Sequence, residues 1–344
     1  MRRQSAALIF LGFVLAACMS VSDGQTAEPQ AGAPASEGAL TVYSGRSEEL
    51  VGPLLARFSE ATGIVVEARY GDTAEMANLI LTEAENSPAD VFFAQDAGAL
   101  GAVAEAGMLS ALPVEVLDRV DERFRSPSGE WVGVSGRARV VVYNTDSVTE
   151  EDLPDSIFGF TDPAWSGRIG WAPTNGSFQA FVTAMRVIEG EDRAREWLEG
   201  IEANDPNAYD GNNAALDAVI AGEIDVAFIN HYYLMQRLAE DPDAPAANHF
   251  LTDGDPGALV NVAGAGVLDT SDNGEAARAF IEYLLSEEAQ SYFAEETKEY
   301  PLVEGVEPDP ALPSLAEIGT PEIDLSALSD LERTLELLQD VGIL

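Results

Sequence analysis

The sequence is poor in the side chains on which most enzymes and thiol-based metal sites depend. Its 344 residues include one cysteine and two histidines. A single cysteine excludes an intrachain disulfide and any Cys-x-x-Cys redox or metal motif. So few thiol and imidazole groups leave little for nucleophilic catalysis. The composition therefore favours a binding protein over an enzyme.

Familiar catalytic and nucleotide-binding motifs are also missing. The chain contains no Gly-x-Ser-x-Gly, Walker loop, Gly-x-Gly-x-x-Gly or His-Glu-x-x-His pattern. The segment 133–137 comes nearest to the first pattern, but Arg137 replaces its last glycine. The segment 264–269 fails the dinucleotide pattern and is expected to be part of a strand. An enzyme is therefore a distant alternative.

Positive charge is scarce. The chain has 18 Lys and Arg against 60 Asp and Glu, a net charge of −42. Such a field repels nucleic acid and anionic membrane surfaces, so we expect no nucleic-acid partner. The acids are scattered, which indicates solubility in a saline setting where salt screens their repulsion. Hydrophobic residues make up 46% of the chain, enough for one large or two medium domains.

The N-terminus has the pattern of a bacterial secretion signal. A basic start precedes an apolar run at 6–17 that is too short for a stable membrane span. The Leu-Ala-Ala-Cys stretch that ends at Cys18 resembles a lipoprotein signal, in which the cysteine is lipidated. Cleavage of an ordinary signal near Ser22 is the alternative. We predict a lipoprotein signal over 1–18 and a flexible linker over 19–38, with the lipid as the only membrane contact.

From residue 40 onward, the apolar pattern alternates between strands and helices. The expected strands of the first region are 40–43, 64–70 and 90–93. The expected helices between and after them are 47–61, one from 73, and 97–107. This order implies a mainly parallel sheet with helices on both faces. Two later runs, 139–143 and 259–268, are expected to be strands that cross between lobes. A last amphipathic helix is expected over 326–340.

The stretch from 223 to 238 holds the strongest functional signal. Its first half reads as a buried strand and its second half as a helix, with Asn230, His231, Tyr232 and Tyr233 at the junction. The start of a helix leaves backbone N–H groups free to meet a ligand. The two tyrosines are either ordinary packing residues or phenolate ligands of a hard cation. A phenol has a pKa of about 10, so a trivalent metal such as ferric iron would have to displace its proton.

The segment Asn-His-Tyr-Tyr at 230–233 resembles the vicinal tyrosine motif of the bacterial ferric-ion-binding periplasmic proteins, the substrate-binding components of iron ABC transporters. Further stretches similar to this family are 41–46, 88–93, 134–144, 255–260 and 285–290. The resemblance runs from about Leu40 to about Glu307. It implies an α/β, two-lobe periplasmic binding protein fold (type II), with a hinge of two crossing strands and a ligand cleft between the lobes.

The expected domain organisation follows from this resemblance. Lobe 1 would comprise 39–137 and 268–310, and lobe 2 would comprise 138–267. The C-terminal helical segment, 311–344, would pack on the back of the lobes.

The resemblance also implies a set of binding residues. Tyr232 and Tyr233 would bind Fe3+ as cargo. A synergistic anion such as carbonate or phosphate would lie against Ser135, Gly136, Arg137, Asn212 and Asn230. Arginine suits bidentate contact with such an anion. Arg46 and Arg139 are weaker candidates, and for Arg139 a salt bridge to one of the many acids is the favoured interpretation.

The sequence departs from the family pattern in the first lobe. Ser47 and Glu48 stand where some members have a histidine or a histidine–tyrosine pair. Gln95, followed by Asp96, stands where some members have a glutamate. Glu48 and Asp96 are possible oxygen ligands, but acids at helix starts are the favoured interpretation. His231 is expected to be a hydrogen-bonded structural residue.

These observations predict a monomeric, lipid-anchored protein of the cell envelope that captures ferric iron and delivers it to an ABC permease and its ATPase. The alternative is the same fold with a polyamine, thiamine or an oxyanion in the cleft. A polyamine site would need acids with aromatic walls, whereas an oxyanion site would need only arginine and amide groups.

Overall fold

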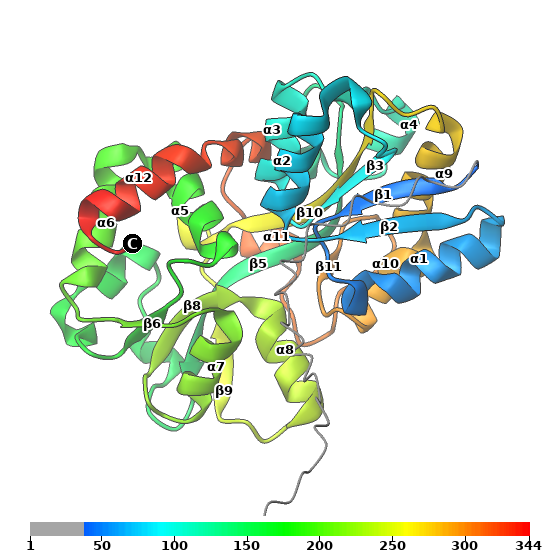
Figure 1. Cartoon of the computed structure of the whole chain (residues 1–344). Coiled ribbons are helices and arrows are strands. Elements are labelled where there is room, and N and C mark those ends of the chain that lie inside the picture. Colours follow the sequence, from blue (N-terminus) through cyan, green and yellow to red (C-terminus); the bar gives the residue numbers. More distant parts are fainter. Residues whose placement is uncertain (1–37) are drawn as a thin grey trace, which may run out of the picture. The chain divides into compact units, whose positions relative to one another are not determined.

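The computed structural model describes residues 38–344, shown in Figure 1. The predicted lipoprotein signal, Cys18 and nearly all of the predicted linker lie outside the described residues. The strands are β1 (Leu40–Ser44), β2 (Val66–Tyr70), β3 (Val91–Ala94), β4 (Leu109–Ser110), β5 (Val132–Asn144), β6 (Ile169–Trp171), β7 (Asn207–Ala208), β8 (Val226–Asn230), β9 (Ala246–His249), β10 (Val260–Leu268) and β11 (Tyr300–Pro301).

The helices alternate with these strands for much of the chain. They are α1 (Glu48–Thr62), α2 (Thr73–Glu83), α3 (Ala97–Glu105), α4 (Val114–Leu117), α5 (Gly176–Glu189), α6 (Glu191–Glu202), α7 (Asn212–Ile220), α8 (His231–Glu240), α9 (Gly274–Leu284), α10 (Glu287–Glu295), α11 (Leu315–Ile318) and α12 (Leu331–Val341).

The first strands form the parallel core that the sequence predicts. β1 pairs in parallel with both β2 and β3. Every residue of β3 is buried, as expected for a strand covered on both faces. Helix α1 ends at Gly63, whose φ of 76° is the left-handed conformation that glycine adopts without a steric penalty. The sheet is mixed rather than mainly parallel, because β10 runs antiparallel to β3.

Strand β5 is the longest strand of the described chain, and all of its residues are buried. Its first half pairs with β10 through residues 132–138, and with β11 at Ser135 and Gly136. Its second half pairs with β8 from Arg139 onward and with β9 from Val141 onward. The partners of β5 therefore change between Ala138 and Arg139, which lies one residue beyond the predicted lobe boundary.

The remaining strands continue from β8. β6 pairs in parallel with β8 and with β7, and helices α5 to α8 alternate with these strands along the chain. The β8–α8 unit confirms the predicted strand-to-helix junction, and α8 begins at His231. No helix within residues 38–344 is both long enough and apolar enough to cross a membrane.

The C-terminal segment differs from its prediction as one helix over 326–340. A short 3₁₀ helix, η7 (Leu325–Ser329), is separated from α12 by Asp330, whose φ and ψ of −74° and 50° are not helical. The backbone carbonyl and the carboxylate of Asp330 both accept hydrogen bonds from Arg186 on α5. These bonds hold the break in place, and α12 then packs against α5 and α6 (Figure 1).

Helix α3 packs tightly against η7 because two glycines face it. A Cβ atom on Gly101 would lie 2.5 Å from the carbonyl oxygen of Ser326, and one on Gly98 would lie 2.5 Å from that of Leu328. Only residues without a side chain permit this approach of two backbones.

We predict that Gly101→Ala destabilises the protein by about 1–3 kcal/mol, because the new methyl group would have to displace backbone atoms. In most helices this substitution is stabilising. The control is Gly274→Ala at the start of α9, where a Cβ would meet no atom within 4 Å. Urea unfolding of both variants checks the prediction, and equal stabilities would contradict it.

Candidate metal- and anion-binding site

The tyrosine pair lies in the first turn of α8. Tyr232 is buried and Tyr233 is half-buried. Their ring centroids lie 4.3 Å apart, with an angle of 27° between the ring planes. Asn230 occupies the N-cap position of α8 without capping it through its side chain. The two phenols are thus adjacent and stacked beside a helix start with free backbone donors.

The surroundings of Tyr232 keep its phenol protonated. Burial raises the pKa of Tyr232 well above its usual value, and the neighbouring Tyr233 and Glu299 raise it further. The positive charge of Arg137 acts in the opposite direction. A cation that binds this oxygen must therefore displace a proton, which a highly charged metal ion can do.

Arg139 lies near both tyrosines and does not form the predicted salt bridge. Its guanidinium donates to Oδ1 of Asn230 at 3.1 Å, to the carbonyl oxygen of Phe228 at 2.8 Å and to Oγ of Ser177 at 3.4 Å. All three acceptors are neutral, and burial lowers the pKa of Arg139 to about 9. The interpretation of Arg139 as a salt-bridge residue was therefore wrong, because its guanidinium group donates hydrogen bonds only to neutral groups.

Arg137 is a second buried cation on the same strand. Its Nη2 donates to the backbone carbonyl of Gln95, and its Nε is buried without a hydrogen-bond partner. Residues two apart on a strand point to the same face, and Arg137 and Arg139 repel each other enough to lower the pKa of Arg139 further. Unsatisfied buried donors are uncommon in proteins and require an explanation.

The predicted anion residue Asn212 begins α7 and is joined by two residues that the sequence reasoning missed. Its Nδ2 lies 3.2 Å from Oγ of Ser177 and 3.4 Å from Oδ1 of Asn175, the N-cap residue of α5. Its own Oδ1 is buried without a partner. The N-termini of α5, α7 and α8 are therefore linked through Asn175, Ser177, Asn212 and the bond from Arg139 to Asn230. The Asn-Gly-Ser sequence at 175–177 is a helix-start signal that could have drawn attention to this position.

Two members of the predicted anion set are engaged elsewhere. The Oγ of Ser135 donates to Glu299 at 2.9 Å, so it is not available to an anion. Gly136 pairs with Val262 of β10 and with Tyr300 of β11. The prediction of Ser135 as an anion donor is therefore not supported, because a buried carboxylate takes its hydroxyl group.

Glu299 also forms an ion pair with Arg46, which the sequence offered as a weaker candidate for the cleft. The two guanidinium nitrogens of Arg46 donate to the two oxygens of Glu299 at 2.9 Å each, and both residues are 1% exposed. Burial alone would raise the pKa of Glu299, but Arg46, Arg137 and Ser135 outweigh it and lower the pKa. No local signal in the sequence indicated a pair separated by 253 positions.

The remaining first-lobe candidates lie at helix starts. Ser47 is the N-cap residue of α1, and Glu48 is in its first turn. Asp96 accepts a hydrogen bond from the backbone N–H of Ala99 at 3.0 Å, which confirms its interpretation as a helix-start acid. The backbone carbonyl oxygen of Gln95 accepts a hydrogen bond from the guanidinium group of Arg137.

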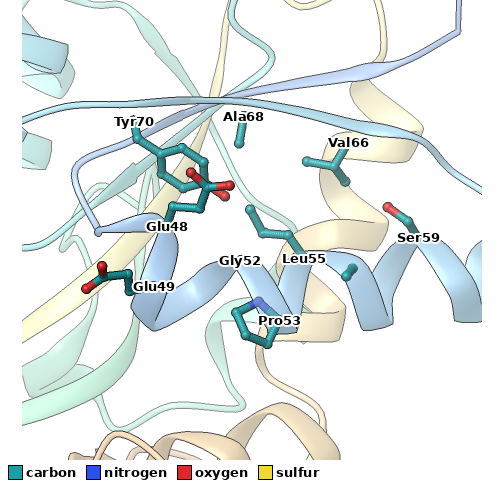
Figure 2. A pocket seen from close by; sticks show the side chains of 10 residues that line it. Glu48, Glu49, Gly52, Pro53, Leu55, Ser59, Val66, Ala68 and Tyr70 are labelled. Atoms are coloured by element: carbon teal, nitrogen blue, oxygen red, sulfur yellow. The ribbon is translucent and has the colours of Figure 1, made fainter.

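Glu48 also lines a cavity of about 510 Å³ between α1 and β2 (Figure 2). The cavity wall includes Glu49 and Tyr70, but neither residue of the tyrosine pair. Burial raises the pKa of Tyr70, and the charge of Glu48 raises it further. Within residues 38–344, no group of three or more His, Cys, Asp or Glu side chains could hold a metal ion.

His231 is a hydrogen-bonded structural residue, as predicted. It is fully buried, and both ring nitrogens have backbone partners. Burial lowers its pKa to about 4, so the ring is neutral at pH 7.

Comparison with known proteins gives consistent matches over nearly the whole chain. A model of bacterial extracellular solute-binding proteins matches residues 86–322. The major ferric iron-binding protein of Neisseria meningitidis serogroup B is 35% identical over 308 residues, which cover 88% of this chain and 92% of that protein. The Fe(3+)-binding periplasmic protein of Serratia marcescens is 31% identical, with coverages of 89% and 90%.

Solved structures agree with these matches. Iron-bound HitA from Pseudomonas aeruginosa is similar with a TM-score of 0.82 and 36% identity, and the match covers 88% of this chain and 99% of HitA. The Trichodesmium protein IdiA (FutA), solved with iron and citrate ligands, has a TM-score of 0.78 and 30% identity, with coverages of 89% and 99%.

We predict that Glu299→Ala costs about 3–5 kcal/mol of stability, because it leaves Arg46 buried and unpaired. The double variant Arg46→Met, Glu299→Leu should recover most of this loss, because it removes both charges. The control Glu196→Ala breaks the exposed pair with Arg193 and should cost less than about 1 kcal/mol. Urea unfolding at pH 7 measures all three.

The same comparison has a defined pH dependence. Because the pKa of Glu299 is lowered in the folded protein, its ion pair with Arg46 stabilises the fold fully at pH values above the ordinary carboxyl pKa of 4.5. This stabilisation is lost as the pH falls below 4.5 and through the lower pKa that Glu299 has in the folded protein. The difference in stability between the parent and Glu299→Ala should therefore shrink as the pH falls below 4.5. A difference that stays constant down to acid pH would contradict this account of the pair.

Proposed function

The chain belongs to the bacterial extracellular solute-binding proteins, and from this we propose that it captures ferric iron for an importer. Its fold is the α/β, type II fold of the ferric-binding periplasmic proteins. Relatives named for ferric iron binding match it at 31% to 35% identity over almost their full length. A binding role, rather than an enzymatic one, is in keeping with these relatives.

The stacked pair Tyr232 and Tyr233 is the observation that carries the proposal. Two phenolates would neutralise two of the three charges of Fe3+ and leave coordination positions open. The pair lies at a helix start, and the surroundings of Tyr232 favour its neutral phenol, so iron would bind to that oxygen with release of a proton. The remaining positions would be filled by an anion or by water. The first-lobe candidates are weaker choices, because Glu48 lines the cavity beside Tyr70, which does not include the tyrosine pair, and the carboxylate of Asp96 already caps α3.

We propose that the anion lies against Arg137, Arg139, Asn212 and Asn230, with Ser177 in place of Ser135. Two buried guanidinium groups, both of which donate hydrogen bonds only to neutral acceptors, create a demand for negative charge. Carbonate and phosphate fit this demand, as does a larger carboxylate anion. The citrate in the iron-bound Trichodesmium structure is an example from a relative.

An oxyanion as the main cargo is the second candidate. The same two arginines favour it, because they would bind an oxyanion without any metal. A polyamine fits less well, since positive charge already occupies the region beside the tyrosines. Thiamine, as a ligand of the same fold, stays an alternative.

The cellular setting is also part of the proposal. A lipid on Cys18 would tether the protein to the membrane of the cell envelope, and a monomer would deliver iron to a permease with its ATPase. The lobes would be 39–137 with 268–310, and 138–267, joined where β5 changes its partners. The segment 311–344 would pack across their back, in keeping with the contacts of η7 and α12.

We predict that the soluble domain lacking residues 1–38 becomes coloured on ferric titration, because tyrosinate-to-iron charge transfer absorbs visible light. Tyr232→Phe with Tyr233→Phe should abolish the band and the uptake, since phenylalanine offers no oxygen ligand. Tyr209→Phe, which alters a tyrosine outside the pair, is the matched control and should keep both. A folded parent that binds no iron would refute the iron proposal and favour an oxyanion.

We predict that Arg139→Gln weakens the enhancement of iron binding by phosphate, carbonate or citrate about tenfold or more, because hydrogen bonds to charged groups contribute about 1.5–3 kcal/mol. The control is Arg168→Gln, which alters a partly exposed arginine paired with Asp225. Titrations at fixed anion concentration measure the effect. Equal enhancement in the parent and in Arg139→Gln would remove Arg139 from the anion site.

A further inference from the structure

His231, directly before the tyrosine pair, uses both ring nitrogens to join separate parts of the backbone. The backbone N–H of Ala138 donates to Nδ1 at 3.2 Å, so Nδ1 carries no proton. The proton is then on Nε2, which donates to the carbonyl oxygen of Lys298 at 2.9 Å. The neutral ring therefore connects strand β5 to the segment before β11.

Ala138 is the residue at which β5 changes partners. β11 pairs with Ser135 and Gly136, whereas β8 pairs from Arg139 onward. The N–H of Ala138 lies between these two ladders and would need another acceptor, because buried backbone donors are almost always paired. The side chain of His231 supplies that acceptor. Ala138 of β5 and the first residue of α8 are thus bonded directly to each other.

The segment on the other side of the imidazole is itself firmly held. Lys298 has a φ of 60°, a conformation that non-glycine residues seldom adopt without support. Next to it, Glu299 is fixed by Arg46 and Ser135. Gln236, one turn further along α8, donates to the carbonyl oxygen of Thr297 at 3.1 Å. Helix α8 is therefore tied to 297–299 at two successive turns.

We propose that His231 is a positioning residue for iron capture, which sets the orientation of Tyr232 and Tyr233 relative to β5 and the segment 297–299. The proposal rests on the proposed function. A metal bound by two adjacent phenolates requires both oxygens in fixed positions, and groups that orient ligands affect affinity strongly. The same bonds join Ala138 of β5 and Lys298 directly to the first residue of the helix that carries the tyrosine pair.

The test uses three variants that separate the two bonds. In His231→Asn, the side-chain oxygen can still accept from Ala138, but the side chain is too short to reach Lys298. In His231→Gln, the amide can reach Lys298, but its geometry does not keep the bond to Ala138. His231→Ala removes both bonds. The control is His249→Gln, which alters the other histidine, whose Nε2 contacts Pro154.

Three measurements are made on the protein lacking residues 1–38, in addition to a check of folding. Amide hydrogen exchange of Ala138 in the iron-free protein reports the bond to Nδ1. Ferric titration against nitrilotriacetate reports affinity, and the charge-transfer band reports the geometry of the tyrosine ligands. Far-UV circular dichroism establishes that each variant is folded, and if His231→Ala does not fold, the Asn and Gln variants carry the test.

We expect exchange protection of Ala138 to persist in His231→Asn and to be lost in the Gln and Ala variants. Ferric affinity should fall about 10- to 100-fold in His231→Ala, as for other groups that orient metal ligands, with a shifted charge-transfer band. The control should keep parental values. Parental affinity and an unshifted band in all folded His231 variants would overturn the proposal alone, whereas a parent that takes up no iron would overturn the proposed function as well.

Discussion

Buried positive charge on strand β5 is the constraint on which the rest of the site depends. Arg137 and Arg139 are both almost fully buried, and the hydrogen bonds of Arg139 run only to neutral groups. Burying a charge without a counter-charge is costly, and repulsion between like charges adds to the cost. The neighbouring phenol of Tyr232, whose pKa is raised by burial, can supply negative charge only when a metal displaces its proton. Metal and anion would therefore stabilise each other in this site.

Several segments of the chain meet beside Ala138 of β5, and their contacts hold these groups together. The strand exchanges β11 for β8 beside Ala138, and the imidazole of His231 fills the gap. The ion pair of Arg46 and Glu299 anchors the segment on the other side. The N-termini of α5, α7 and α8 supply polar groups around Arg139. Each connection joins residues far apart in the chain, so the site exists only in the folded protein.

Local features could be predicted from the sequence, and partners distant in the chain could not. The apolar run before Asn230 and the spacing after it predicted the β8–α8 junction, because strand and helix periodicities differ. The neutral partners of Arg139 were not foreseen, since 60 acids made a salt bridge the reasonable expectation. Glu299 was missed because its pairing depends on tertiary structure. The apolar pattern over 326–340 predicted helix correctly on either side of Asp330, but the bonds from Arg186 that break it come from another helix.

The most direct test of the account is anomalous X-ray diffraction at the iron absorption edge, from crystals of the protein loaded with ferric iron and carbonate. We expect one strong anomalous peak within bonding distance of the phenolic oxygens of both Tyr232 and Tyr233, with an anion between the iron and Arg139. An iron peak elsewhere, for instance in the cavity beside Glu48 and Tyr70, or no peak in a protein that binds the anion, would contradict it.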